Sequence, residues 1–336
     1  MKELETLLEP LDEINAYRQA RECIDRNKLP VHISGCIDTQ KCHMIYGLSK
    51  DIPWKIIIAQ NEIRAREIVD DYRMFDRNVL YYPAKDVIFY SADVHGSAIS
   101  VERLKVIKAL FNQKGGTIVT TMDAGMEFVL SLSVFDKAKY VIKEADIVDI
   151  ESFCSHLVDI GYERQAQVEA PGQFSVRGGI MDIYPVTDDC PYRIDLWDNE
   201  VDTIKSFDVE SQRSIERVES FEVFPATELI LTDEQLKKGF DNIKKHQKKA
   251  IDRFSKEKNH DAVNRLKELV SDVKNNFELY LGRMGMESYI GYFPVQTGSL
   301  FDYFDSDNSI FFIDEALRCE EKMEAVEKEF SESMQG

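Results

Sequence analysis

The sequence predicts an α/β protein in which a helix-covered parallel sheet accompanies a smaller α+β domain with an antiparallel sheet. Up to about residue 138, strand-like apolar runs alternate with helical stretches of about 10–15 residues, a pattern typical of parallel sheets. From about 139 to 224 the strand-like runs follow one another closely, as in antiparallel sheets. After about 225 a long stretch with little glycine or proline is predicted to be helical, and an apolar run near 310 follows it.

In the first segment, apolar residues at helical spacing predict a helix over Leu11–Arg26. A short strand, Val31–Ser34, and a turn beginning at Gly35 are expected next. The remaining elements predicted there are a helix near Lys41–Ser49, the apolar run Lys55–Ala59, a helix over Ile63–Phe75, a strand over Val79–Tyr82, a helix over Val101–Phe111 and a strand over Thr117–Thr121.

The second segment is predicted to form one helix and at least four strands. The helix covers Ile150–Gly161, and the strands cover Gln173–Arg177, Gly179–Tyr184, Tyr192–Trp197 and Val201–Phe207. A polar turn over residues 197–200 predicts a hairpin, and Gly178-Gly179 indicates a bulge or sharp bend.

The third segment begins with a capping-box pattern at Thr232-Asp233-Glu234-Gln235. Helix is predicted from there to about Leu281, in two pieces. The segments Tyr289–Phe293 and Ser299–Phe304, a strand over Ile310–Ile313 and a charged helix over Glu315–Phe330 complete the chain.

Composition and charge limit the possible classes. At ~150 residues per domain, 336 residues favour two or three domains. The 42 basic and 61 acidic side chains give a net charge of −19, which argues against a non-specific polyanion binder but leaves room for a local basic patch. The longest apolar runs fall far short of the ~20 residues of a membrane span, and the acidic, amphipathic N-terminus resembles neither a signal nor a transit peptide.

Cysteine and histidine usage predicts neither a metal site nor a hydrolytic site. The six cysteines include no CxxC pair and no zinc-type spacing with histidine, and no HExxH or GxSxG motif is present. Scattered cysteines are typical of a reducing cytosol, so we expect a cytoplasmic protein without disulfides, metal or cofactor.

The run from Gly35 to Cys42 has the position of a phosphate-binding loop, between a predicted strand and a helix. A working loop reads GxxxxGK[ST], and this run keeps Gly35 and Lys41 but has Gln40 for the second glycine and Cys42 for the hydroxyl residue. A Cβ at position 40 disfavours the wrapping backbone, and a thiol is a poor magnesium ligand. An ordinary strand–turn–helix therefore explains this run better than intact nucleotide chemistry.

An Asp314-Glu315 pair follows the apolar run Phe311-Phe312-Ile313. In ATP-driven motors such a pair holds magnesium and the attacking water. The same pair is also common at an ordinary helix N-terminus, where carboxylates suit the helix dipole.

Alternation along Tyr192–Trp197 places Arg193, Asp195 and Trp197 on one polar face, and the same count through the strand over Gln173–Arg177 turns Arg177 outward. A tryptophan flanked by arginines on a solvent face is typical of a protein-binding hot spot. A tryptophan covered by another domain, or a merely solvated face, is the alternative.

Six lysines lie between residues 237 and 249, with Asp241 as the only acid among them: Lys237, Lys238, Lys244, Lys245, Lys248 and Lys249. Their spacing predicts a basic stripe on a helix, which could meet phosphates or simply be a solvated face. Phe240 is expected to face a core, so no platform for stacking nucleobases is predicted.

Together these segments resemble one family. The run from Gly172 to Pro185, the run from Pro191 to Asp198 and the run from Ser206 to Ser214 closely resemble the UvrB-homology region of bacterial transcription-repair coupling factors (Mfd), and more weakly the excision-repair helicase UvrB. The segment Ser299–Phe304 with Phe312–Glu315 is also similar to UvrB, in which the acidic pair belongs to a DE-box.

The departures from UvrB favour the coupling factors. The phosphate loop is degenerate at Gln40 and Cys42, no DE-box histidine follows Asp314 and Glu315, and the stretch Leu80–Ser100 has no counterpart of the Tyr-rich hairpin with which UvrB grips DNA. No second motor domain follows either. The resemblance thus implies a UvrB-like body without ATP hydrolysis, and the chain is expected to be a fragment of a longer translocase.

The resemblance implies a degenerate RecA-like, P-loop sheet built from two segments, with an inserted UvrA-binding domain. Residues 1–138 correspond to UvrB-like domain 1A, residues 139–224 to the UvrA-interaction domain, and residues 225–336 to a largely helical domain 1B that completes the first. The family positions for UvrA binding match Arg177, Arg193 and Trp197, of which the last is commonly phenylalanine.

The resulting prediction is an adaptor that recruits UvrA in transcription-coupled nucleotide excision repair and has no catalytic residues of its own. Its other expected partners are further domains of the coupling factor, with DNA and RNA polymerase reached only through parts absent from this chain. The alternatives are a UvrB-type DNA-dependent ATPase using Lys41, Asp314 and Glu315, and DNA binding through the lysines between 237 and 249.

Overall fold

The computed structural model describes residues 2–85, 95–280 and 287–333, which form two compact units. Unit 1 comprises Met1–Asp86, Lys105–Glu127 and Ser299–Gly336, and unit 2 comprises Val87–Leu104 and Phe128–Gly298. The boundary falls within helix α5 (His95–Asn112). The division of the sequence into three segments stays a prediction, and the two units differ from it by grouping the helices between 233 and 280 with the middle sheet.

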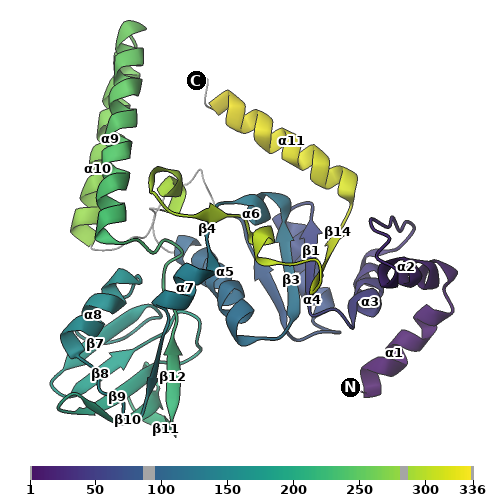
Figure 1. The fold of residues 1–336 in the computed structure, drawn as a ribbon, viewed down its shortest axis with the longest axis horizontal. Coiled ribbons are helices and arrows are strands. Elements are labelled where there is room, and N and C mark those ends of the chain that lie inside the picture. Colours follow the sequence, from purple (N-terminus) through teal and green to yellow (C-terminus); the bar gives the residue numbers. More distant parts are fainter. Residues whose placement is uncertain (1, 86–94, 281–286, 334–336) are drawn as a thin grey trace. The chain divides into compact units, whose positions relative to one another are not determined.

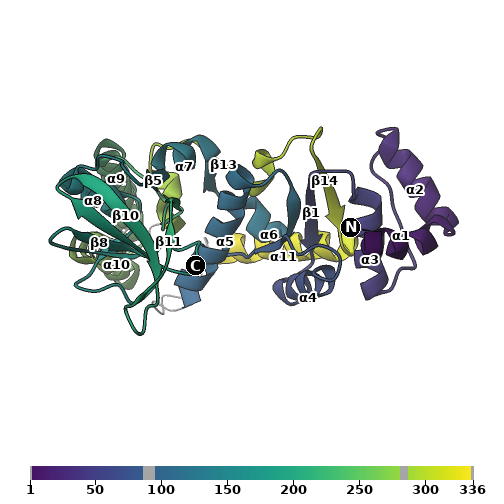
Figure 2. The same cartoon turned by 90° about the horizontal axis from the view of Figure 1, so that it is seen from below.

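Unit 1 contains a four-stranded parallel sheet in the order β14-β1-β3-β2. Its strands are β1 (Trp54–Ala59), β2 (Val79–Tyr82), β3 (Gly116–Thr121) and β14 (Ser309–Ile313). The last strand returns from a distant part of the sequence and pairs with β1 from Trp54↔Ser309 to Ile58↔Ile313 (Figure 2). The predicted parallel sheet of two sequence segments is therefore confirmed.

Helices pack around this sheet, and their apolar side chains form its core. Ile68, Val69 and Tyr72 of α4 are buried against Ile57 of β1 and Val119 of β3. The helical elements of unit 1 are α1 (Lys2–Asp12), α2 (Asn15–Asp25), α3 (Asp38–Ser49), α4 (Glu62–Tyr72), α6 (Met122–Met126), the 3₁₀ turn η2 (Leu300–Tyr303) and α11 (Ala316–Ser333).

Two predictions for the N-terminal region needed correction. The helix predicted over Leu11–Arg26 is present as α2 but begins only at Asn15, because Leu11 belongs to α1 and the chain turns so that Leu11 of α1 and Tyr17 of α2 both pack on α3. Residues 31–34 form no strand, because β14 occupies the edge of the sheet beside β1. Val31 and Ile33 instead pack against the three N-terminal helices.

Unit 2 contains a six-stranded sheet in the order β11-β10-β9-β8-β7-β6, antiparallel except for the β6–β7 pair. Its strands are β6 (Glu163–Arg164), β7 (Gln173–Arg177), β8 (Ile180–Ile183), β9 (Tyr192–Trp197), β10 (Glu200–Phe207) and β11 (Ser214–Val218). The predicted hairpin is present, with Asp198 at a φ of 57° in its turn, and Gly178-Gly179 forms the turn between β7 and β8. Helix α8 (Ile150–Asp159) packs on the apolar face of this sheet (Figure 1).

The remaining elements of unit 2 include a two-stranded sheet that the sequence analysis missed. In it β5 (Tyr140–Lys143) pairs with β12 (Ser220–Val223). The predicted helix pair is α9 (Asp233–Lys256) and α10 (His260–Tyr280), and the capping box at Thr232 and Gln235 is formed. Leu281, the predicted end of that pair, lies outside the described residues. The other elements are β4 (Val129–Leu130), α7 (Leu132–Ala138), the 3₁₀ turn η1 (Glu287–Tyr292) and β13 (Thr297–Gly298).

None of the helices in the described ranges is both long enough and apolar enough to span a lipid bilayer.

Candidate functional site

The polar face of the six-stranded sheet is arranged in rows, which the strand register defines. The first row runs across four strands through Ser175, Asp182, Arg193 and Lys205, each opposite the next. The second row runs through Arg177, Ile180, Asp195 and Thr203, and the third contains Trp197 and Glu200. Because paired residues of antiparallel strands share a face, Arg177, Arg193 and Trp197 lie on one side of the sheet.

Asp182 holds the two arginines of this face together. Its carboxylate is fully buried and accepts hydrogen bonds from Arg193 Nε at 2.7 Å, from Arg193 Nη2 at 2.9 Å and from Arg177 Nη2 at 2.7 Å. A buried carboxylate is stable only when paired and hydrogen-bonded, and here both oxygens have guanidinium partners. The paired guanidinium groups are therefore fixed in position before any partner arrives.

The two arginines differ in what they offer to a partner. Arg193 is 18% exposed, donates further hydrogen bonds to Gln212, and places its guanidinium 4.6 Å from the centre of the Phe207 ring. Arg177 is 47% exposed and makes one hydrogen bond, through Nη2, within the described part of the chain. Arg177 thus has donors available for a partner, whereas Arg193 mainly organises the face.

Trp197 lies at the end of β9 and is 81% exposed. Glu200 separates it from Ile147, which bridges to Glu200 from the other side and is 80% exposed. Ile180, in the second row, is also exposed. Two large apolar side chains so open to water, beside anchored arginines, are typical of an interaction surface.

Sequence reasoning missed Asp182 and Ile147. A lone acid inside the apolar strand Ile180–Ile183 is a signal that a buried ion pair is present, because an unpaired carboxylate would not be tolerated there. Ile147 carried no such signal, because it lies outside the named strands and meets the face only through the bridge to Glu200.

In unit 1, the run from Gly35 to Cys42 does not have the shape of a phosphate loop. Gly35 has a φ of 86°, but α3 begins at Asp38, so Gln40, Lys41 and Cys42 are already helical. The backbone N–H of Lys41 donates to the Ile37 carbonyl at 2.9 Å within this helix, so it is not available to a phosphate. Cys42 is buried in the core near Ile57, and burial raises the pKa of its thiol to about 11, which leaves it neutral.

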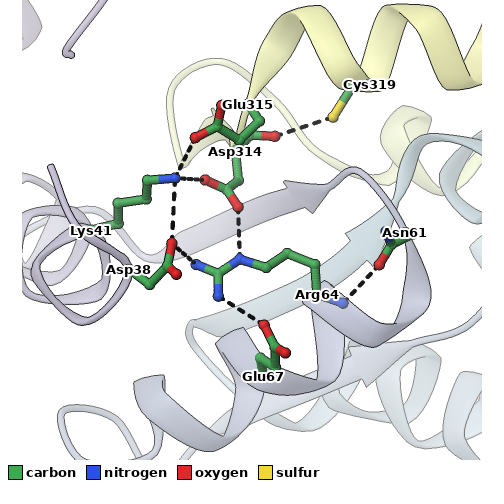
Figure 3. Close-up of polar contacts among 8 residues, drawn as sticks. All are labelled: Asp38, Lys41, Asn61, Arg64, Glu67, Asp314, Glu315 and Cys319. Carbon is green, nitrogen blue, oxygen red and sulfur yellow. Dashed lines mark hydrogen bonds and ion pairs between the residues drawn. The ribbon is translucent and has the colours of Figure 1, made fainter. Parts of the chain in front are cut away.

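Lys41, the lysine of this run, is surrounded by carboxylates (Figure 3). Its Nζ donates to Asp314 Oδ1 at 2.8 Å and to Glu315 Oε1 at 2.6 Å, and lies 3.7 Å from Asp38 Oδ1. The structure thus brings together Lys41, Asp314 and Glu315, as the resemblance to a nucleotide site implies. Here, however, the lysine and the acidic pair bind each other.

Arg64 of α4 completes this cluster (Figure 3). Its Nε donates to Asp314 Oδ2 at 3.0 Å, its Nη1 donates to Glu67 at 3.0 Å, and its Nη2 lies 3.1 Å from Asp38. Two cations and four carboxylates give the cluster a formal charge of −2, so its field disfavours a phosphate. We call these six residues the charge cluster: Asp38, Lys41, Arg64, Glu67, Asp314 and Glu315.

The charge cluster makes the stability of unit 1 depend on pH. Burial opposes ionisation of Asp314, but the hydrogen bonds from Lys41 and Arg64 outweigh it and hold the pKa of Asp314 below its usual value. A lowered carboxyl pKa stabilises the fold above the unfolded value of about 4, and this contribution is lost as pH falls through the folded value. At neutral pH we therefore expect Asp314→Asn to lower the free energy of unfolding by about 2–4 kcal/mol.

The pH dependence of this loss can be measured by urea unfolding at pH 7 and pH 3. Trp54 of β1 is buried and Trp197 is already exposed, so the change in tryptophan fluorescence reports mainly on unit 1. The difference in the free energy of unfolding between wild type and Asp314→Asn should be smaller at pH 3 than at pH 7. A difference that is the same at both pH values would contradict a stabilising role for the ionised Asp314 carboxylate.

Within the described ranges, no group of three or more His, Cys, Asp or Glu side chains is arranged to hold a metal ion.

Comparison with known proteins places these observations in a family context. Residues 141–229, which include β7 to β12, match the model of the UvrB interaction domain. The chain is 33% identical over 282 residues to the transcription-repair-coupling factor of Bacillus subtilis, covering 82% of this chain and 23% of that protein. It is 28% identical over 287 residues to the same factor of Staphylococcus epidermidis, which covers 85% of this chain and 24% of that protein. It is also 28% identical over 273 residues to the factor of Staphylococcus aureus, which covers 81% of this chain and 23% of that protein.

The chain spans about a quarter of the length of these curated relatives. More than four fifths of it aligns with them, and its middle matches a UvrB domain. The predicted resemblance is thereby confirmed: the chain is similar over most of its length to one part of the bacterial transcription-repair-coupling factors, and residues 141–229 match the UvrB interaction domain.

Proposed function

We propose that this chain recruits UvrA in transcription-coupled nucleotide excision repair, through the polar face that carries Trp197 and Arg177. The observation that carries the proposal is the indole of Trp197, 81% exposed on the same face as two guanidinium groups already fixed by Asp182. Tryptophan and arginine are the residue types that most often dominate binding energy. Their match to the UvrA-binding positions of the family supports UvrA as the partner.

The geometry suits a specific contact. Trp197 lies two strand spacings across the sheet from Arg177 and two residues further along β9, which corresponds to a distance of roughly 12 Å. A partner that buries the indole and Ile147 and presents a carboxylate to Arg177 would combine an apolar anchor with a charge-assisted hydrogen bond. Because Asp182 pre-organises the arginines, little ordering entropy opposes binding.

The direct test is calorimetric titration of purified UvrA with this chain. We expect saturable binding that does not require ATP hydrolysis by the chain. Absence of heat, together with absence of co-migration in size-exclusion chromatography, would contradict the proposal.

We further propose that the chain does not hydrolyse ATP, because the lysine and the acidic pair that the resemblance assigns to a nucleotide site bind one another in the charge cluster. A triphosphate would have to displace Asp314 and Glu315 from Lys41, against a local charge of −2. We also propose that translocation along DNA and contact with RNA polymerase, as the resemblance implies for the full-length protein, reside in parts that this chain does not span.

Incubation with Mg-ATP and damaged DNA tests this second point. We expect the same background phosphate release from wild type and from Lys41→Ala. Measurable turnover that Lys41→Ala abolishes would instead favour the alternative, a UvrB-type DNA-dependent ATPase using Lys41, Asp314 and Glu315.

A further inference from the structure

Helix α9 of unit 2 carries a surface strongly positive in a strongly acidic chain. All six lysines between residues 237 and 249 are exposed, and we call them the basic face: Lys237, Lys238, Lys244, Lys245, Lys248 and Lys249. The chain as a whole has a net charge of −19, so this local excess of cations is the reverse of its average.

Packing on the opposite side of α9 fixes the direction of the basic face. Leu236, Gly239 and Ile243 are buried, and Phe240 meets Phe293 edge to face with ring centres 6.3 Å apart. A Cβ on Gly239 would lie 2.1 Å from Phe293, so this side of the helix is in close contact. Helix α10 packs along α9 as well (Figure 1). The lysines therefore cannot rotate inward, and they remain toward solvent.

The charge of the basic face is almost unneutralised. Among described residues, only Lys238 of the six forms an ion pair, with Glu234 at 2.6 Å. Asp241 is the only acid between residues 237 and 249. Five ammonium groups thus lack a carboxylate partner in the described structure, although the chain contains 61 acids.

The residue types of the basic face indicate its ligand. Lysine is depleted in protein–protein interfaces, whereas it binds phosphate as a point charge. Within residues 237–249, which the structure describes in full, neither ring is free to stack a base, because Phe240 is engaged by Phe293 and His246 meets Tyr292 edge to face. Single-stranded nucleic acid is held largely by such stacking, and duplex is not.

We propose that the basic face binds the phosphate backbone of duplex DNA without reading its sequence. From Lys237 to Lys249 the helix rises about 18 Å, a length along which a duplex carries about ten phosphate charges. The proposal does not rest on UvrA recruitment, which uses a different surface.

The test is fluorescence anisotropy of a labelled 20-base-pair duplex with the whole chain, from 50 to 200 mM salt. The test variant replaces Lys244, Lys245, Lys248 and Lys249 by alanine. If these four groups contact phosphates, its log–log salt slope becomes less steep by about 3–4, and affinity at 50 mM salt falls at least 50-fold.

A matched control removes four exposed lysines elsewhere, Lys28, Lys50, Lys143 and Lys322, and changes the net charge equally. The control should change affinity less than threefold, and arginine at the four test positions should retain binding. The proposal would be overturned if the test variant and the control lost equal affinity for the duplex, or if the wild-type chain did not bind the duplex at 50 mM salt. It would also be overturned if the chain bound single strands or polyglutamate more tightly than the duplex. Circular dichroism of each variant confirms that α9 stays folded.

Discussion

Replacing Asp182 by alanine is expected to lower the free energy of unfolding of unit 2 by about 3–5 kcal/mol. The carboxylate is fully buried and accepts three hydrogen bonds of 2.7–2.9 Å from Arg177 and Arg193. Without this carboxylate, the largely buried guanidinium of Arg193 loses its only ion-pair partner in the described structure. It remains packed between Gln212 and the ring of Phe207. Urea unfolding followed by circular dichroism, with hydrogen exchange of peptides covering β8 and β9, measures the loss.

Asp195 provides a matched control on the same face. Its carboxylate is partly exposed and pairs with Lys205 at 2.8 Å. Partly exposed pairs contribute little, so Asp195→Ala should cost less than about 1 kcal/mol. Equal losses in the two variants would contradict the role of Asp182 as the buried anchor of the arginines.

The faces of the middle sheet could be predicted from sequence because they depend on a local rule. Side chains alternate along a strand, so the segment Tyr192–Trp197 by itself separates Ile194, which is buried in the core, from Arg193 and Trp197. The same count placed Arg177 correctly. What alternation could not give was the difference between the two arginines, because that depends on Asp182 of a neighbouring strand and on Gln212 of a loop.

The charge cluster could not be predicted because its members are distant in sequence. Lys41 and Asp314 are 273 residues apart and meet only because β14 joins the sheet beside β1. The same pairing explains the wrong strand at residues 31–34, since no local pattern shows that a later segment already occupies that edge. The sequence therefore singled out Lys41, Asp314 and Glu315 one by one, whereas their contact with one another could be seen only in the tertiary structure.

Replacing Trp197 by alanine is expected to weaken UvrA binding by at least about 2 kcal/mol, or about 30-fold, because a buried interface tryptophan is a typical hot spot. The indole is 81% exposed in the free chain, so its removal should leave the free energy of unfolding within about 0.5 kcal/mol of wild type. Titration calorimetry with UvrA and urea unfolding of the same sample measure the two quantities.

Variants of the neighbouring residues show whether the surface acts as one site. Trp197→Phe keeps an aromatic ring and should stay within about fivefold of wild type, while Arg177→Ala and Ile147→Ala should each weaken binding by about 1 kcal/mol. Ile63→Ala, at a similarly exposed isoleucine of unit 1, is the matched control for Ile147 and should leave UvrA binding unchanged. Arg193→Ala cannot separate binding from folding, because Arg193 is itself part of the Asp182 anchor. If Trp197→Ala binds UvrA as tightly as wild type, the exposed indole is not the recruiting contact and the polar face loses its proposed role.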